Sequence, residues 1–312
     1  MKSLFLSSLL ALGLLAVPAQ AAEYPAKPIT LMTAFNAGGG SDVSHRLLEK
    51  FAKGVFDQPI VVTYKAGAGG EIGWTWLVGA KADGYTIGGV DLPHIVLQPM
   101  LRPEGQPGYK TEQLSPLCGL VYDADVVMVP EDGPYKTFKD LIEYAKANPG
   151  KVKVATVGKL TGDHLFLMQI EKLTGAKFTQ VPYSGSGKAI PALLSGEVDA
   201  YFGSGSSFLR MEKTRGLAIG SKERYELCPD VPTFIEQGYA IESGKYRGLA
   251  TPQNIPAEAR QYLETKFAEL CANPEYQKAV KSSGLMPQFQ TGKAFGEIIR
   301  TEGEQAKKIL EA

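Results

Sequence analysis

A run of three glycines beside polar side chains is the clearest candidate for binding chemistry in this sequence. Glycines 38–40 follow the apolar run 29–35 and precede Ser41 and Asp42. Glycine lets the backbone adopt conformations closed to other residues, and Ser41 or Asp42 could cap a helix that begins here. Free N–H groups at a helix start, with the positive end of the helix dipole behind them, suit a carboxylate or a phosphate. An ordinary tight turn between a strand and a helix is the alternative interpretation.

A second glycine-rich loop repeats this arrangement. Residues 60–64 have the β-branched content of a strand, residues 67–70 contain three glycines, and residues 74–80 form an apolar helix candidate. Two strand–loop–helix units in succession predict a parallel α/β sheet, whose ligands bind at the carboxyl ends of the strands.

The second loop also matches part of the dinucleotide-binding fingerprint. Gly67, Gly69 and Gly73 have a related spacing, and Asp91 closes the next strand, where a ribose-binding acid would be expected. The loop belongs to the second unit of the sheet, however, and an export sequence would remove the protein from cytoplasmic cofactors. A dehydrogenase is therefore the weaker interpretation, and we expect no cofactor.

The N-terminus has the pattern of a secretory signal peptide. Lys2 precedes an apolar run at 4–17, and small residues around Ala21 provide an A-x-A cleavage site. The run is shorter than the roughly 18 to 20 apolar residues that a spanning helix needs. We therefore expect cleavage near Ala21, with residues 1–21 removed, and a soluble protein in the periplasm.

The composition indicates a globular protein of one large or two mid-sized domains. The 312 residues include 33 Lys and Arg and 33 Asp and Glu, without a basic block, which argues against a nucleic-acid surface. Cys118, Cys228 and Cys271 allow at most one internal disulfide. His45 is expected to point outward from the first helix, and the three histidines lack zinc-site spacing. No serine lies in a nucleophile-elbow pattern, so we expect no metal site and no catalytic residues.

Strand, loop and helix recur in the middle of the chain. Residues 153–157 predict a strand, and residues 163–174 predict a helix with Asp163 as its cap. Loops rich in glycine and hydroxyl groups, at 183–187 and 203–207, follow the next two predicted strands. Several helix starts that converge on one cleft would favour an anion.

Two strands are expected to connect the first part of the chain with this middle part. Residues 118–129 predict the crossing strand, and residues 245–251 predict the return strand. Helices at 258–271, 275–282 and 293–310 would then pack on the first part.

An ordered set of short motifs covers nearly the whole mature chain. It begins with Tyr-Pro-Ala-Lys-Pro-Ile at 24–29 and includes the first glycine loop with Arg46, Gly-Ala-Gly-Gly-Glu-Ile-Gly at 67–73 and Ala-Asp-Gly-Tyr-Thr at 82–86. It continues with motifs at 144–151, 181–183, 196–199 and 229–233. Each motif is weak alone, but in this order they resemble the periplasmic solute receptors of tripartite tricarboxylate transporters, also called Bug receptors.

This resemblance implies an α/β protein with the two-lobed type II periplasmic binding fold, which closes its cleft on a small organic carboxylate and passes it to integral-membrane transporter subunits. Lobe 1 would comprise residues 22–122 and 246–312, and lobe 2 residues 123–245. In such receptors the two glycine loops of the first lobe hold a carboxylate through backbone amides and ordered water. We expect a monomer that binds without covalent change. A secreted enzyme acting on a small carboxylate and a receptor for a sensor kinase are the alternatives.

Three residues depart from the family pattern, and we assign ligand discrimination to them. His94 ends a first-lobe strand, Lys159 lies in a second-lobe loop, and Arg247 stands where an aromatic residue is usual. Arg247 could grip a carboxylate with two hydrogen bonds or pair at the surface with Glu242 or another acid, and Lys159 could equally be a solvated lysine. The predicted ligand-binding residues are Phe35, Asn36, Gly38, Gly39, Gly40, Ser41, Asp42, Gly67, Ala68, Gly69, Gly70, His94, Gly158, Lys159, Thr161, Asp163, Tyr183, Ser184, Gly203, Ser204 and Arg247.

Overall fold

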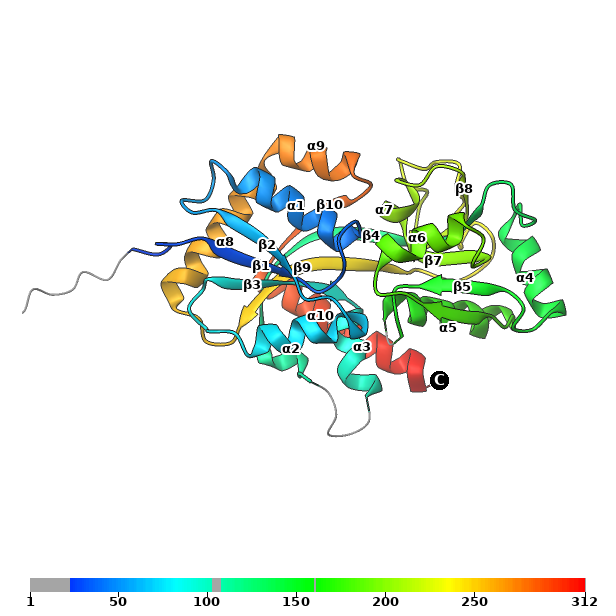
Figure 1. Cartoon of the computed structure of the whole chain (residues 1–312), viewed down its shortest axis with the longest axis horizontal. Helices are drawn as coiled ribbons and strands as arrows, with labels where there is room; N and C mark the ends of the chain where they lie inside the picture. Colours follow the sequence, from blue (N-terminus) through cyan, green and yellow to red (C-terminus); the bar gives the residue numbers. More distant parts are fainter. Residues whose placement is uncertain (1–22, 103–107, 160, 312) are drawn as a thin grey trace, which may run out of the picture.

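Two long antiparallel strands run through the middle of the molecule and join its two halves (Figure 1). The computed structural model describes residues 23–102, 108–159 and 161–311. Strand β4 (Leu114–Pro130) pairs with β9 (Gly244–Pro252), and the far end of β4 pairs with strands of the second half. The two predicted connecting strands are therefore present. The predicted lobe boundaries at 122/123 and 245/246 fall inside β4 and β9, and they stay a prediction.

The first half contains the two predicted strand–loop–helix units. Its strands follow the order β2-β1-β3-β9-β4, with β1 parallel to β2 and β3, and with β9 antiparallel to β3. The units supply β1 (Ile29–Thr33), α1 (Gly40–Ala52), β2 (Ile60–Tyr64), the 3-10 turn η1 (Ala68–Gly70), α2 (Glu71–Val78), β3 (Thr86–Leu92) and α3 (His94–Leu101).

The second half repeats the same design around a smaller sheet. Strands β7, β5 and β6 are parallel neighbours, and β4 pairs with both β7 and β8. Its elements are α4 (Phe138–Ala147), β5 (Lys153–Thr156), α5 (Gly162–Thr174), β6 (Thr179–Pro182), α6 (Ser186–Leu194), β7 (Ala200–Ser204), α7 (Gly205–Phe208) and β8 (Thr214–Ile219). The α/β fold class is confirmed.

The C-terminal helices return to the first half, as predicted. They are α8 (Ala257–Ala272), α9 (Pro274–Ser282) and α10 (Gly292–Glu311), with β10 (Met286–Thr291) pairing on β4. The last turns of α10 also reach the second half, because Ala306 packs with Leu97 of α3 and Leu165 of α5. Among the described residues no helix is both long and apolar enough to cross a membrane. The predicted signal peptide lies outside the described residues.

Each half has its own apolar core, and all three cysteines are free, buried thiols. Cys118 and Cys271 belong to the core of the first half, whereas Cys228 packs in the second half. Burial raises the pKa of Cys228 to about 11 and that of Cys271 to about 12. The disulfide that the sequence allowed is therefore not formed.

Helix α1 buries a different face from the one we predicted. His45 was expected to point outward, but it is only 1% exposed and shares a hydrogen bond of 2.7 Å with Thr33. Its ring occupies the space left by Gly89, where a Cβ atom would lie 2.0 Å from the ring. The prediction was wrong because Gly89 of strand β3 has no side chain and therefore leaves room for the imidazole.

Candidate functional site

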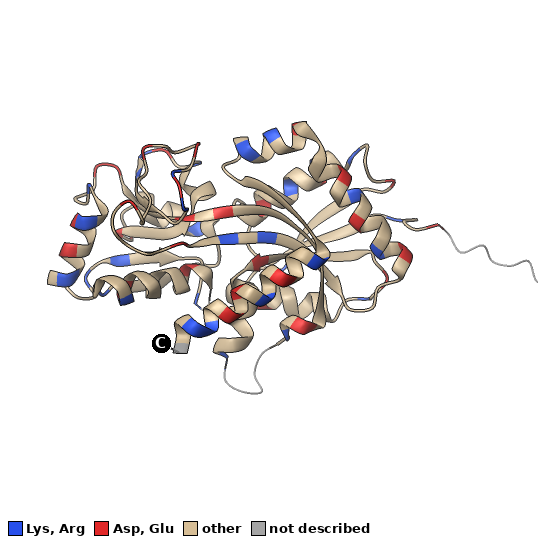
Figure 2. Cartoon of the chain, turned by 180° about the vertical axis from the view of Figure 1, so that it is seen from behind, with Lys and Arg blue, Asp and Glu red and all other residues tan. Residues whose placement is uncertain are grey.

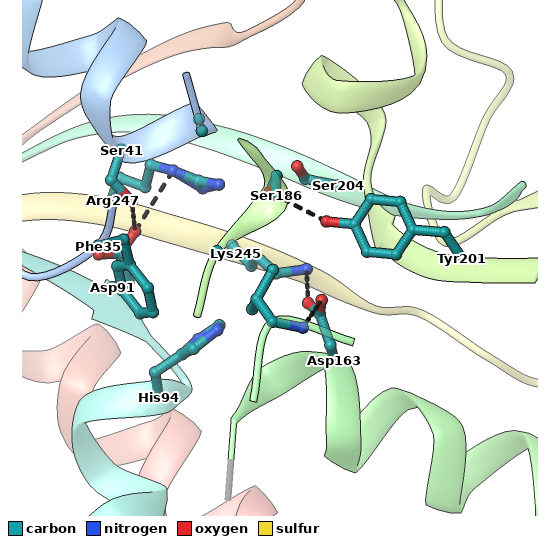
Figure 3. Close-up of a pocket in the computed structure, with 14 residues that line it drawn as sticks. Phe35, Ser41, Asp91, His94, Asp163, Ser186, Tyr201, Ser204, Lys245 and Arg247 are labelled. Atoms are coloured by element: carbon teal, nitrogen blue, oxygen red, sulfur yellow. Dashed lines mark hydrogen bonds and ion pairs between the residues drawn. The ribbon is translucent and has the colours of Figure 1, made fainter. Parts of the chain in front are cut away.

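A small buried cavity lies between the two halves, and the crossing strand β9 forms one side of it (Figure 3). Its walls enclose about 20 Å³, which is room for one water-sized occupant. The halves therefore lie close together in this structure. The lining residues are Phe35, Gly39, Gly40, Ser41, Asp91 and His94 from the first half, Val157, Asp163, Gly185, Ser186, Tyr201 and Ser204 from the second, and Lys245 and Arg247 from β9.

The first glycine loop presents an uncapped helix start to this cavity. Gly39 is the N-cap residue of α1, and no side chain caps the helix. The predicted caps have other partners: Ser41 donates a hydrogen bond to Asp91 (2.7 Å), and Asp42 accepts the N–H of Gly38 (2.8 Å). The first amides of a helix have no intrahelical acceptors, so those at the start of α1 suit an anion.

Gly40 also allows a close approach of Arg247. A Cβ atom at this position would lie 2.5 Å from Nη2 of Arg247 and 3.0 Å from Oγ of Ser206. By contrast, a Cβ atom at Gly39 would meet no atom nearer than 3.7 Å. The packing at Gly40 therefore connects the glycine loop with the charged residues of β9.

The second glycine loop lies outside the cavity lining. It meets the loop before α5 instead: a Cβ atom at Gly69 would lie 3.0 Å from the carbonyl oxygen of Lys159 and from a methyl group of Thr161. The Lys159 side chain is exposed, and Thr161 caps α5 by accepting the N–H of His164 (3.4 Å). The second loop therefore takes part in the contact between the halves.

Arg247 is buried between two carboxylates. Its Nε lies 3.3 Å from Asp91, and its Nη2 lies 3.1 Å from Asp123. The surface pairing with Glu242 is wrong for this structure, because Arg247 is only 4% exposed and Glu242 pairs with Lys222. Its third nitrogen, Nη1, has no hydrogen-bond partner among the described residues.

Lys245 is held in the same way, two residues earlier on β9. Its Nζ contacts Asp125 and lies 2.9 Å from Asp163. Burial alone would lower the pKa of Lys245, but the two carboxylates more than offset that effect and raise it. Asp163 was predicted to cap α5 and does not: one of its oxygens accepts the N–H of Val157 (3.0 Å), while the other faces Lys245.

His94 presents a neutral imidazole to the cavity. It begins α3, is 1% exposed and packs edge-on against Phe35 at 5.5 Å between ring centres. Burial lowers its pKa well below the ordinary value, and the positive charges of Lys245 and Arg247 lower it further. Its Nδ1 has no hydrogen-bond partner among the described residues. The ring can therefore exchange a hydrogen bond with a ligand without adding charge.

The second half contributes hydroxyl groups. Tyr201 donates a hydrogen bond to Ser186 at the start of α6 (3.0 Å), and Ser204 lies 3.0 Å from Ser207. Sequence reasoning did not place Ser186, Tyr201 or Lys245 in the site. For Lys245 a signal was available, because residues two apart on a strand share a face and Arg247 was already a candidate.

The structure brings some of the predicted site residues together and leaves the others outside the lining. Ligand contact stays a prediction for all of them. Those in the lining are Phe35, Gly39, Gly40, Ser41, His94, Asp163, Ser204 and Arg247; those outside it are Asn36, Gly38, Asp42, Gly67, Ala68, Gly69, Gly70, Gly158, Lys159, Thr161, Tyr183, Ser184 and Gly203.

Solved structures of similar fold come from periplasmic binding proteins. The periplasmic binding protein BugD is 26% identical, with a TM-score of 0.85, and the match covers 92% of this chain and 98% of BugD. MatC from Rhodopseudomonas palustris, solved with bound malate, is 22% identical, with a TM-score of 0.84 over 92% of this chain and 99% of MatC. The similarity to MatC shows the fold.

Sequence relatives and a family model give the same result. BugT of Bordetella pertussis is 35% identical over 287 residues, 89% of this chain and 86% of BugT. A Cupriavidus necator protein, called UPF0065 protein in gbd 5'region, is 30% identical over 305 residues, 96% of this chain and 92% of that protein. The model of the tripartite tricarboxylate transporter family receptor matches residues 45–312. This chain therefore belongs to the tripartite tricarboxylate transporter receptor family, the family of the Bug proteins.

Proposed function

We propose that this protein is a periplasmic receptor that captures a small organic carboxylate between its two halves and delivers it to the membrane subunits of a tripartite tricarboxylate-type transporter. Its family consists of solute-binding receptors, and MatC, which shares the fold, was solved with malate. The mature protein would be a monomer, with its signal peptide cleaved near Ala21.

The observation that carries this proposal is a set of buried polar groups without hydrogen-bond partners around one cavity. Nη1 of Arg247 and Nδ1 of His94 are buried without partners among the described residues, and both side chains line the cavity. The uncapped start of α1 lies in the same lining. A ligand carboxylate would supply the missing acceptors, since buried polar groups are stable only when they are hydrogen-bonded.

Contacts between the halves support a receptor that closes on its ligand. Asn36 in the first glycine loop donates a hydrogen bond to Ser184 of the second half (2.7 Å). Arg210 donates to the carbonyl of Gly38 at 3.4 Å. Closure through such contacts would exclude water from the ligand and give the transporter a surface that differs from the open form.

Ligand identification tests the proposal directly. We would denature purified protein, identify released small molecules by mass spectrometry, and screen carboxylates by thermal shift. A ligand at 100 times its Kd stabilises a protein by about 2.7 kcal/mol, so a binding carboxylate should raise the melting temperature. Recovery of the unchanged ligand after incubation supports a receptor. Turnover of the ligand would show an enzyme, and the absence of any carboxylate ligand would contradict the proposal.

A further inference from the structure

The first glycine loop is held from behind by side chains that are not in the lining of the cavity. Figure 2 shows Lys, Arg, Asp and Glu residues spread over the helices of both halves, and one connected set of them lies on α1. Asp42, Arg46 and Glu49 are four and three residues apart, so they share one face of that helix. This face meets the end of β2, where Tyr64 completes the set.

Asp42 connects the glycine loop to Tyr64. One carboxylate oxygen of Asp42 accepts the N–H of Gly38 (2.8 Å), and the other accepts the hydroxyl of Tyr64 (2.5 Å). Gly38 has a φ of +86°, a backbone conformation that favours glycine, so this bond fixes a turn that most residues would not adopt. Burial and the hydrogen bond with Asp42 raise the pKa of Tyr64, so its hydroxyl keeps its proton and donates.

Tyr64 is itself held in place by the same face of α1. Arg46 donates to the Tyr64 oxygen from Nε and Nη2, at 3.2 and 2.8 Å, and its Nε lies 3.6 Å from Asp42. The third nitrogen of Arg46 donates to Glu49 (2.7 Å), which in turn accepts the N–H of Val62 on β2 (3.0 Å). A continuous chain of hydrogen bonds therefore runs from the backbone of a sheet strand to the backbone of the glycine loop.

This chain affects the part of the loop that a ligand would meet. Gly39, Gly40 and Ser41 line the cavity, whereas the N–H of Gly38 is already used by Asp42. The amides at the start of α1 can face an anion only while the turn before them keeps its shape. A loop that is ordered before binding also loses less conformational freedom when the ligand arrives.

We propose that Tyr64 is a positioning residue for the ligand: through Asp42 it holds the first glycine loop in the conformation that turns the amides of α1 toward the cavity. This inference rests on the proposed function, because a carboxylate is what those amides would bind. Tyr64 ends β2, and the second glycine loop begins three residues later at Gly67. The strand that leads into the second loop therefore supports the first loop.

NMR spectroscopy of protein freed of small molecules by unfolding and refolding tests this role. Tyr64→Phe removes the hydroxyl and keeps the ring that packs beside the core of the first half. We expect the amide-proton signal of Gly38 to move upfield, because its bond to the carboxylate loosens. Hydrogen exchange of this amide should become about tenfold faster, the effect of losing one hydrogen bond to a charged group. Asp42→Asn, which removes the charge of the acceptor, should change both quantities in the same direction and by more.

Tyr85→Phe is the matched control. It removes a hydroxyl of the same half, one that accepts the N–H of Ala26 (2.8 Å), and it should leave the signal and the exchange rate of Gly38 as in wild type. A general loss of stability in Tyr64→Phe would speed exchange throughout the first half, whereas a positioning role changes the loop alone. An unchanged Gly38 signal in Tyr64→Phe, or faster exchange spread over the whole half, would overturn the proposal. The measurement needs no ligand, so a failed carboxylate screen would contradict the receptor without altering this result.

Discussion

The two strand–loop–helix units of the first half look alike in sequence but have different surroundings in the fold. Helix α1, after the first loop, buries the polar side chains of Ser44 and His45 and begins at the cavity. Helix α2, after the second loop, buries Trp74 and Leu77 in an apolar core. A glycine loop before a helix is therefore not enough to define a binding site. The polar groups that approach it decide what it can bind.

The close contacts of the glycines show the same difference. Gly40 leaves room for Arg247, which arrives from a distant strand. Gly70 leaves room for Trp74 of its own helix, whose ring would lie 2.4 Å from an added Cβ atom. The first contact is between distant parts of the chain and involves a charged residue, whereas the second is local and apolar.

The largest difference between the two units should appear in how the first unit makes the stability of the protein depend on pH. Burial, followed by the charge of Arg247, lowers the pKa of His45 in α1 from 6.5 to about 3. Between these values the unfolded chain binds a proton that the folded chain does not, so stability falls as the pH falls, by up to about 1.4 kcal/mol per pH unit. We expect His45→Gln to flatten this slope in denaturant titrations from pH 7 to pH 4.

The raised pKa of Asp91 and of Asp125 changes the stability with pH in the opposite direction. This contribution is the same in wild type and in His45→Gln, so it cancels when their slopes are compared. His164→Gln is the comparison variant: burial lowers the pKa of His164 as well, but His164 is only partly buried, so this substitution should change the slope less than His45→Gln does. Parallel slopes for wild type and His45→Gln would show that the histidine is not buried in neutral form in solution.

The next effect is on affinity and separates the two loops. Gly40→Ala should weaken binding of the ligand found in the screen by about 10- to 100-fold, because its methyl group displaces Arg247, and overpacking costs about 1 to 3 kcal/mol. Gly39→Ala is the matched control, since its methyl group meets only ordinary contacts, and it should bind nearly as wild type does. Calorimetric titration of both folded variants would measure their ligand affinities.

Gly69→Ala should act on stability more than on affinity. The backbone of Gly69 has a φ of +67°, and a side chain in that region costs about 1 to 3 kcal/mol. Denaturant titration should show this loss, while the affinity of the refolded protein stays within a fewfold of wild type. A loss of affinity as large as that of Gly40→Ala would place the second loop in the site.

The smallest effects concern the contacts between the halves. Asn36→Ala removes the hydrogen bond to Ser184 and should weaken binding by about 2- to 10-fold, mainly through faster ligand release. Lys159→Ala should change affinity less than twofold, because that side chain is exposed and outside the lining. Stopped-flow dissociation rates would distinguish them, and a larger effect at Lys159 would restore it as a ligand contact.

The sequence was sufficient for the fold because local patterns decide it. Apolar runs, glycine loops and helix stops predicted both units of the first half and the two crossing strands. Two of the elements that escaped prediction lack such patterns: β10 contains Pro287 and is largely exposed, and α3 contains Pro99. The buried face of α1 was missed because it depends on Gly89 of another strand.

The charged centre of the site could not be predicted in the same way. The antiparallel register of β9 with β3 and β4 sets the backbone of Arg247 opposite Asp91 and that of Lys245 opposite Asp123, and the side chain of Asp123 then pairs with Arg247. That register joins residues far apart in the chain, so no local pattern contains it. The candidate Arg247 was found by its departure from a family pattern. Asp163 was also predicted in the site, but its pairing with Lys245 was not, and Asp91, Asp123 and Asp125 were not predicted as partners of the two cations.

The three buried thiols give each half its own reporter of unfolding. Cys118 and Cys271 lie in the core of the first half and Cys228 in the second, all with a pKa raised by burial. An alkylating reagent reacts with the thiolate, so it should modify each cysteine only when the surrounding core opens. The order in which the three cysteines become labelled in the native protein would therefore show which half opens first, without introducing a new cysteine.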